Sequence, residues 1–493
     1  MRMMVDVDYE VVIGLEVHAQ LLTASKMFCG CSADYVNAPP NTHVCPICMG
    51  MPGVLPVINQ RAVEYTIMTA LALNCTIAEF SKFDRKNYHY PDLMKGYQIS
   101  QYDIPLSRNG YLTVRLENGE EKRIGIHRVH LEEDTAKLLH REDGNGRRYS
   151  LLDINRAGVP LIEIVSEPDI RSPVEARLYM QKLRAILVAL GVSSGVLAEG
   201  SMRCDANVSL RPRGETRLGT KTEVKNMNSF RAVQRALEFE VERQMAILRA
   251  GGHIEQETRG WVEEKGITVA QRSKEQAHDY RYFPEPDLPP LVISREYVEQ
   301  IRARMPELPD ARRARFISQY GLSELDATEL TNEPALADYF ERALALSKAG
   351  DQRARAKAVS NWIMTELGRL LNLHRVSITE CRVSPESLNE LLDLVEAGRI
   401  SGRQAKEVLE QVFATGERPG VIVEREGIYQ LSDQSELERI VEEVIGSNTK
   451  AVGDYRRGKL AAKQALIGQV MKRTQGRASP EVVNTLIEAR LTR

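Results

Sequence analysis

Hydrophobic and polar positions alternate along two segments in the first part of the chain. Residues 9–22 and 202–210 each place apolar side chains on one face and polar side chains on the other. This period of two predicts strands with one face towards a core. Two segments follow a helical period instead: residues 173–191, and a stretch that begins after Ser229. Both open with a serine that can cap a helix.

The pattern changes after the proline-rich stretch at residues 284–290. Strand patterns become rare, and short helical segments take over. Ser384 and Gly398 bound one such segment, Ser401 and Gly416 bound the next, and an apolar stripe at residues 437–446 marks a third. Serine before a helix and glycine after it are the usual start and stop signals.

These patterns predict several domains, because 493 residues with 43% hydrophobic content exceed what one compact core organises. We expect an α+β domain over residues 1–295, with a mixed or antiparallel sheet, helices and a metal-bound loop. All-α regions are expected to follow over residues 296–412 and 413–493.

Charge is balanced overall but uneven along the chain. The formal net charge is −2, yet residues 450–493 hold ten basic and three acidic side chains, which leaves −9 for the rest. A basic terminal region on an acidic body suggests a polyanionic partner, although a solvated helical surface would look the same. The sequence has no membrane-spanning run and no secretion signal, so we expect a cytoplasmic protein without membrane contacts.

Four cysteines form a tight cluster: Cys29, Cys31, Cys45 and Cys48. A CxxC turn brings two thiolates to one ion, and the CxC pair can complete a tetrahedral shell. Structural zinc is therefore expected, with no open position for catalysis; the alternative is a set of unconnected thiols. Cys75, Cys204 and Cys381 lie in apolar patterns and are interpreted as core residues.

Polar groups recur at strand spacing in four segments. The segments carry Glu16 with His18, His130 with Glu132, Asp205 with Asn207, and Lys221 with Glu223 and Lys225. If the strands are neighbours, oxygen ligands and lysines converge as a Mg²⁺ and phosphoryl site requires. Taken singly, each segment is more often the solvent face of an amphipathic strand, and it is the recurrence in one domain that favours the site. Basic and aromatic residues also interleave over residues 82–102 and 278–284, which suits base stacking or a loop packed by its own rings.

The sequence closely resembles one family, the GatB subunits of the aspartyl/glutamyl-tRNA amidotransferases. The matching stretches are IGLEVHAQ at 13–20, the cysteine cluster through CPICMGMPG at 45–53, RKNYHYPD at 85–92, LEEDT at 131–135, DINRAGVPL at 153–161, RCDAN at 203–207, EVKN at 223–226 and DYRYFPEPDL at 279–288. The resemblance implies a cradle domain, a helical domain and a tRNA-binding tail.

The resemblance also implies a reaction and its participants. GatB proteins use ATP to phosphorylate the side-chain carboxylate of Glu-tRNA(Gln), Asp-tRNA(Asn) or both, and ammonia from an amidase-type glutaminase partner displaces the phosphate; a small third protein completes a heterotrimer. The implied residues are Glu16, His18 and Glu132 for Mg²⁺ and catalysis, Glu223 and Asp205 as further catalytic groups, Lys86 and Lys95 for the ammonia channel, Cys29, Cys31, Cys45 and Cys48 for zinc, and Tyr88, Tyr90, Asn207 and Arg281 for the tRNA acceptor end.

Two alternatives remain at this stage. A zinc-stabilised tRNA-binding scaffold would explain the cysteines and the basic tail but not the recurring acidic strand faces. The archaeal-type relative, GatE, carries an extra inserted domain, for which this chain has no room between its cradle and tail signatures. The chain also lacks a GxxxxGK[ST] loop and a GxSxG elbow, which agrees with a division of labour between the proteins of a complex.

Overall fold

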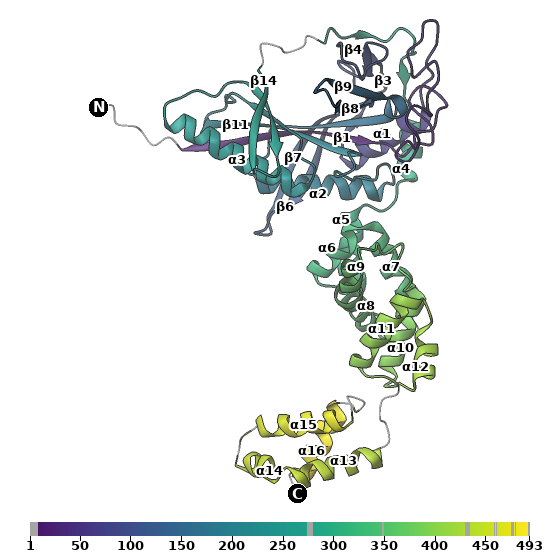
Figure 1. Ribbon diagram of the computed structural model, residues 1–493, viewed down its shortest axis with the longest axis vertical. Helices are drawn as coiled ribbons and strands as arrows, with labels where there is room; N and C mark the ends of the chain where they lie inside the picture. Colours follow the sequence, from purple (N-terminus) through teal and green to yellow (C-terminus); the bar gives the residue numbers. More distant parts are fainter. Residues whose placement is uncertain are drawn as a thin grey trace, which may run out of the picture. The chain divides into compact units, whose positions relative to one another are not determined.

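The computed structural model describes residues 8–273, 280–347, 350–428, 434–457, 459, 461–474, 478 and 480–491. The chain divides into two compact units, Met1–Leu308 and Pro309–Arg493 (Figure 1). The first contains the sheets and the second is helical, so the expected fold class is confirmed. No helix in the described ranges is long and apolar enough to cross a membrane.

A nine-stranded mixed sheet organises the first unit. Its strands, in spatial order, are β14 (Ile267–Ser273), β13 (Glu257–Val262), β12 (Thr222–Lys225), β11 (Met202–Pro212), β1 (Tyr9–Gln20), β10 (Pro160–Ser166), β7 (Glu121–Glu133), β6 (Ser107–Arg115) and β2 (Thr76–Ile77). Only β12 and β13 pair in parallel among these neighbours. The two strands predicted from alternation, β1 and β11, lie side by side near the middle of the sheet.

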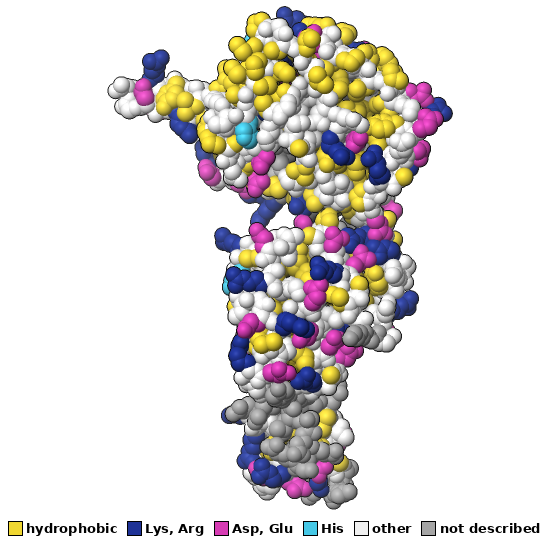
Figure 2. All heavy atoms as spheres, turned by 90° about the vertical axis from the view of Figure 1, so that its right-hand side faces the viewer, with side chains coloured by type: hydrophobic (Ala, Val, Ile, Leu, Met, Phe, Trp, Pro, Cys, Tyr) yellow, Lys and Arg dark blue, Asp and Glu magenta, His cyan; other side chains and the backbone are white. Residues whose placement is uncertain are grey.

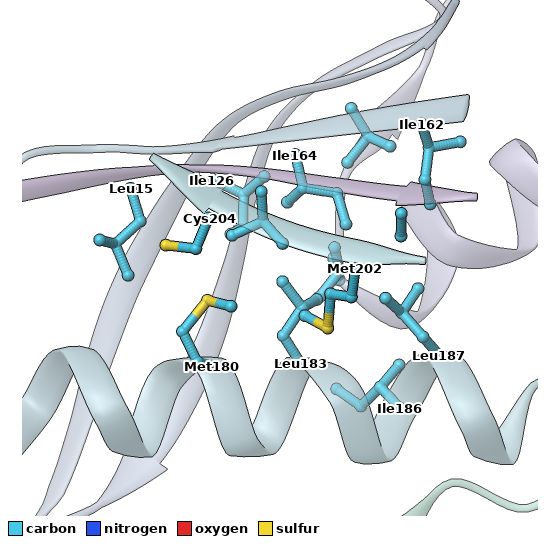
Figure 3. Packing of buried hydrophobic residues seen from close by; sticks show 14 of the residues in the cluster. Leu15, Ile126, Ile162, Ile164, Met180, Leu183, Ile186, Leu187, Met202 and Cys204 are labelled. Carbon is cyan, nitrogen blue, oxygen red and sulfur yellow. The ribbon is translucent and has the colours of Figure 1, made fainter. Parts of the chain in front are cut away.

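Helices cover the apolar face of this sheet. They are α1 (Gln60–Ala72), α2 (Pro173–Ala189) and α3 (Phe230–Arg249). The predicted start of α2 is correct: Ser172 accepts a hydrogen bond from the Glu175 backbone amide at 3.2 Å. Met180, Leu183 and Leu187 of α2 pack against the apolar side chains of the central strands, Met202 and Cys204 among them (Figure 3). The opposite face of the central strands is left to polar side chains.

Three small sheets surround the main one. They are β15 (Phe283–Pro284), β4 (Asp84–Asn87) and β5 (Tyr97–Ser100); β16 (Leu291–Val292) with β3 (Phe80–Ser81); and β8 (Lys137–Glu142) with β9 (Arg148–Asp153), which a 3₁₀ turn η1 (Ile154–Arg156) follows. Two hydrogen bonds bring β5 against the end of β7: Gln98 Nε2 donates to the Glu133 carbonyl at 2.7 Å, and Ser100 Oγ donates to Glu132 Oε2 at 3.0 Å. A helix α4 (Arg295–Ala303) ends the unit.

The second unit consists of short capped helices around two hydrophobic cores. The helices are α5 (Pro309–Tyr320), α6 (Glu324–Asn332), α7 (Pro334–Ala345), α8 (Gln352–Trp362), a π turn (Ile363–Leu367), α9 (Gly368–His374), α10 (Pro385–Glu396), α11 (Gly402–Thr415), α12 (Pro419–Glu426), α13 (Gln434–Ser447), α14 (Thr449–Arg456), α15 (Ala461–Arg473) and α16 (Pro480–Leu491). The boundary expected at residue 412 lies within α11. The first core continues to Val423 because α11 and α12 pack together, and the second core begins at Leu437.

Candidate active site and cysteine centre

The polar strand faces converge because of the sheet register. His18 of β1 lies opposite Glu163 of β10 on one side and Arg203 of β11 on the other. Glu163 in turn lies opposite His130 of β7. Directly opposed residues in an antiparallel pair point to the same face, so these side chains must meet.

His18, Glu132 and Glu163 form the tightest group on this face. His18 Nε2 is 3.3 Å from Glu163 Oε2 and 3.6 Å from Glu132 Oε1, and one ligand atom from each residue lies within 4.8 Å of the others. His130 Nε2 is 3.6 Å from both Glu132 Oε2 and Glu163 Oε2. An imidazole with two buried carboxylates is a donor set that suits a divalent cation.

Mutual electrostatics oppose the effect of burial on this group. Burial alone would lower the pKa of His18, but the hydrogen bond and charge of Glu163 raise it above its ordinary value. Burial alone would raise the pKa of Glu132, but His130 and the Lys86 charge hold it below its ordinary value. The carboxylates therefore remain ionised and available to a cation.

A second acidic cluster continues the first along β1, β11 and β12. Asn207 Nδ2 donates to Glu16 Oε1 at 2.9 Å, and Lys225 forms ion pairs with Asp205 and, at 3.1 Å, with Glu223. Burial and the charges of Glu163 and Asp205 raise the pKa of Glu16. Glu16 thus stands next to the His18 group, but it is not one of the three residues whose ligand atoms cluster together.

A cavity of about 560 Å³ opens at this polar face. Its walls include His18, Glu132, Asp205 and Tyr88, together with the cations Lys86, Arg203 and Lys225. Arg203 is fixed by the buried carboxylate of Asp134, at 3.0 Å. Tyr90 and Arg281 are not among the described residues that line this cavity; Tyr90 is exposed, and Arg281 lies next to the 274–279 gap, which holds His278 and Asp279 of its motif.

The two lysines singled out in the sequence lie on different cavities. Lys86 lines the cavity beside His18, where the charges of Glu132 and Glu163 overcome the effect of burial and raise its pKa. Lys95 lines a second cavity of about 180 Å³ with Glu133 and two of the cysteines, and its Nζ is 2.6 Å from Glu133 Oε1. Glu132 and Glu133 are consecutive residues of β7, and each lines a different one of these two cavities.

The aromatic residues of the basic and aromatic segments pack mainly on one another. Tyr102 stacks on Tyr282 at 4.2 Å between ring centroids, Tyr282 meets Tyr280, and Tyr280 meets Tyr88. Lys86 Nζ lies 4.9 Å from the centroid of Tyr280. Of the two interpretations of these segments, the structure shows the loop packed by its own rings. Tyr88 lies at the end of this row of rings and also lines the cavity.

The four clustered cysteines come together as the spacing predicts. The sulfur atoms of Cys29, Cys31, Cys45 and Cys48 lie within 4.8 Å of one another. The Cys45 backbone amide donates to Cys48 Sγ at 3.1 Å, which is how a CxxC turn brings its thiols together. The hydrogen bond with Cys29 lowers the pKa of Cys48 to about 5, and burial raises that of Cys31 to about 11. The set fits a structural zinc ion. Cys75 and Cys204 are buried, whereas Cys381 is half-buried against the helical core.

Glu163 is the residue of this site that the sequence patterns missed. It lies in β10, where Ile162 and Ile164 face the core. A single carboxylate within an apolar strand was the signal that could have identified it, because an unpaired buried charge is costly. Glu133 was missed because its partner, Lys95, lies outside any regular strand.

Comparisons with known proteins follow the division into two units. A family model described as the GatB/GatE catalytic domain matches residues 11–299, and one described as the GatB domain matches residues 338–491. Over 486 residues, and 99% of both chains, the sequence is 56% identical to the B subunit of the aspartyl/glutamyl-tRNA(Asn/Gln) amidotransferase of Carboxydothermus hydrogenoformans. It is 57% identical over 484 residues to the protein of the same name from Moorella thermoacetica, covering 98% of this chain and 100% of that one. Both units therefore have counterparts in these relatives.

Proposed function

Because the chain belongs to the GatB family, we propose that it activates the side-chain carboxylate of Glu or Asp attached to tRNA and converts it to the amide. ATP would phosphorylate the carboxylate of Glu-tRNA(Gln), Asp-tRNA(Asn) or both, and ammonia would displace the phosphate. The observation that supports this most is the convergence of His18, Glu132 and Glu163 beside a cavity lined by three cations. Residues 1–295 would hold the catalytic site, followed by a helical domain and a tail whose boundary we place between Val423 and Leu437 instead of at residue 412.

The site residues suit phosphoryl transfer in distinct ways. His18, Glu132 and Glu163 would hold Mg²⁺, which when bound neutralises phosphate charge. Glu16, Asp205 and Glu223 add carboxylates on the same face. Lys86, Arg203 and Lys225 point positive charge into the cavity, as a transferring phosphoryl group requires. For the aminoacyl end we propose Tyr88, which lines the cavity, together with Asn207, Tyr90 and Arg281, which are not among its described lining residues.

Ammonia would arrive from the other side of β7. Lys95 and Glu133 line a separate cavity, whereas Lys86 and Glu132 line the reaction cavity. Exposed apolar residues from the cysteine loop and from β3 and β16 suit docking of an amidase-type glutaminase partner. They are Met51, Leu55, Val57, Phe80 and Val292. Figure 2 shows hydrophobic side chains gathered on this side of the first unit. A small third protein would complete a heterotrimer.

The basic tail and the proposed reaction imply tRNA as a further partner. Of the ten basic residues in 450–493, Arg477 and Arg493 lie outside the described residues. Phosphate contacts by such a region would position the tRNA without reading its sequence. Since the product of the proposed reaction would be consumed in translation, we propose a cytoplasmic location.

The test is amidation by the purified chain with its amidase partner, using misacylated Glu-tRNA(Gln), ATP-Mg²⁺ and ammonium chloride without glutamine. We expect ATP-dependent Gln-tRNA that Glu132→Ala abolishes while glutaminase activity is partly retained. Glu167→Ala is the matched control, because Glu167 is a half-buried carboxylate whose one ion pair among the described residues is with His127. Normal product from Glu132→Ala would contradict the assignment. Tight tRNA binding without ATP-dependent product would favour a non-catalytic zinc-stabilised scaffold.

A further inference from the structure

Lys26 is a fully buried lysine beside the cysteine centre. Its exposure is 1%, which places it among the largest completely buried side chains in the described part of the molecule. Its backbone amide donates to the Cys31 carbonyl at 2.9 Å, and its side chain lines the same cavity as Cys29 and Cys48. Gly158 brings Lys26 and Cys48 together: a Cβ at Gly158 would lie 3.5 Å from Lys26 Cδ and 3.9 Å from Cys48 Cβ.

The ammonium group has hydrogen-bond acceptors but no ion pair. Lys26 Nζ donates to the His43 carbonyl at 2.8 Å and to the Ile154 carbonyl at 3.3 Å. Glu133 lines the same cavity, but Lys95 binds its carboxylate at 2.6 and 2.8 Å. Within the described ranges no carboxylate pairs with Lys26. A buried charge without a counter-charge is strongly unfavourable, so Lys26 needs a nearby negative group.

The metal-loaded cysteine centre supplies that negative charge. Four thiolates around Zn²⁺ leave an excess of negative charge, because the ion offsets only part of theirs. We propose that Lys26 is the built-in counter-charge of the zinc–tetrathiolate centre and that metal retention depends on it. This rests on the structural zinc ion that the four cysteines fit, and it adds a residue to that site.

The surroundings of Lys26 hold it beside the loop that carries the cysteines. The loop that carries the cysteines is tied to η1 and the end of β9 by further hydrogen bonds. Asn41 Nδ2 donates to the Leu152 carbonyl at 3.0 Å, the His43 amide donates to Asn155 Oδ1 at 2.8 Å, and Asn155 Nδ2 donates to the Pro39 carbonyl at 2.7 Å. Lys26 bridges the same two segments from inside, so its ammonium group cannot swing out to solvent while they remain joined.

The experiment compares zinc retention in the full chain loaded with zinc. Lys26→Gln keeps amide donors for the two carbonyls but removes the charge, and Lys26→Met removes both. Lys122→Met is the matched control, because Lys122 pairs with Glu175 at 2.6 Å and lies on β7. Zinc release to a chromogenic chelator is followed with time, and melting temperatures are measured with and without zinc. We expect release about 10-fold faster or more in both Lys26 variants and unchanged release in Lys122→Met.

The zinc-free proteins provide the second measurement. Without zinc, fewer of the four thiols are deprotonated and less negative charge faces Lys26, so zinc-free Lys26→Met should melt at or above the temperature of the zinc-free parent. Faster release from Lys26→Met but not from Lys26→Gln would overturn the proposal, because hydrogen bonding would then be the cause. Equal retention by all variants would also overturn it while leaving the zinc assignment intact. A parent chain that binds no zinc would overturn the assignment itself.

Discussion

At the scale of single residues, the acidic groups around His18 depend on one another. Burial would raise the pKa of Glu163, but the neighbouring His130, His18 and Lys86 favour its ionised form and hold its pKa well below the ordinary value. Removing any one charge therefore changes the ionisation of the others, and the group should respond as a unit.

Glu163→Gln tests this at the position that the sequence patterns overlooked. We expect ATP-dependent amidation to fall by about 100-fold or more and Mn²⁺ binding to weaken, because one of the three clustered ligand groups loses its charge. Binding of Mn²⁺ can be followed by its paramagnetic effect on water relaxation. Glu167→Gln should behave as the parent does. Unchanged Mn²⁺ binding in Glu163→Gln would exclude Glu163 from the cation site.

The site was predictable from sequence only in part. Glu16, His18, Glu132 and Asp205 stand out because each alternates with apolar residues in a strand. Which carboxylates meet is a different matter, since it depends on β10 lying between β1 and β7. That neighbour relation joins segments far apart along the chain, and no local pattern encodes it.

At the scale of elements, β6 is held against the end of α1 by a glycine. A Cβ at Gly110 would lie 2.3 Å from Cys75 Sγ and 2.5 Å from the Leu73 carbonyl oxygen, so the backbone would have to move. Gly110→Ala should destabilise the first unit by roughly 2–3 kcal/mol. Urea unfolding followed by Trp261 fluorescence in a Trp362→Phe background measures this, with Gly144→Ala as the control because its Cβ would meet no atom within 4 Å. Equal midpoints for the two variants would contradict the expectation.

An ion-pair network joins α5 and α7 in the second unit. Glu341 accepts hydrogen bonds from Arg315 and Arg312 at 2.6 Å each, and these outweigh burial and lower its pKa below 4.5. A lowered folded-state pKa contributes stability above the unfolded value that disappears as pH falls through the folded value.

Glu341→Gln should therefore cost on the order of 1 kcal/mol at pH 7 and progressively less below about pH 4.5. Trp362 fluorescence in a Trp261→Phe background reports unfolding of this unit alone. Glu407→Gln, which removes only an exposed pair with Arg403, should change stability little at either pH. A cost that does not depend on pH would show that packing, not charge, is responsible.

Elements with strong local signals were predicted well, and those defined by distant partners were not. The serine caps of α2, α10 and α11 and the glycine end of α11 follow directly from the sequence. The short strands β3, β4, β15 and β16 had no usable pattern, because two- to four-residue strands exist only through their partners.

At the scale of the whole molecule, the two units have separate hydrophobic cores, and the second unit itself holds two. A fragment of residues 309–493 should therefore fold alone, with a helical circular dichroism spectrum and a cooperative transition. It should also bind tRNA with an affinity that falls steeply as salt rises, because phosphate contacts release counterions. A fragment that is unfolded in isolation would show that the units depend on each other.

Strand β7 separates the cavity beside His18 from the cavity beside the cysteines. A strand is one backbone thick, and adjacent residues on it point in opposite directions. Glu132 and Glu133 are thus a single peptide bond apart yet belong to separate chambers. Under the proposed function, one strand would separate the activated intermediate from the ammonia supply, and a change in the twist of β7 would alter both cavities together.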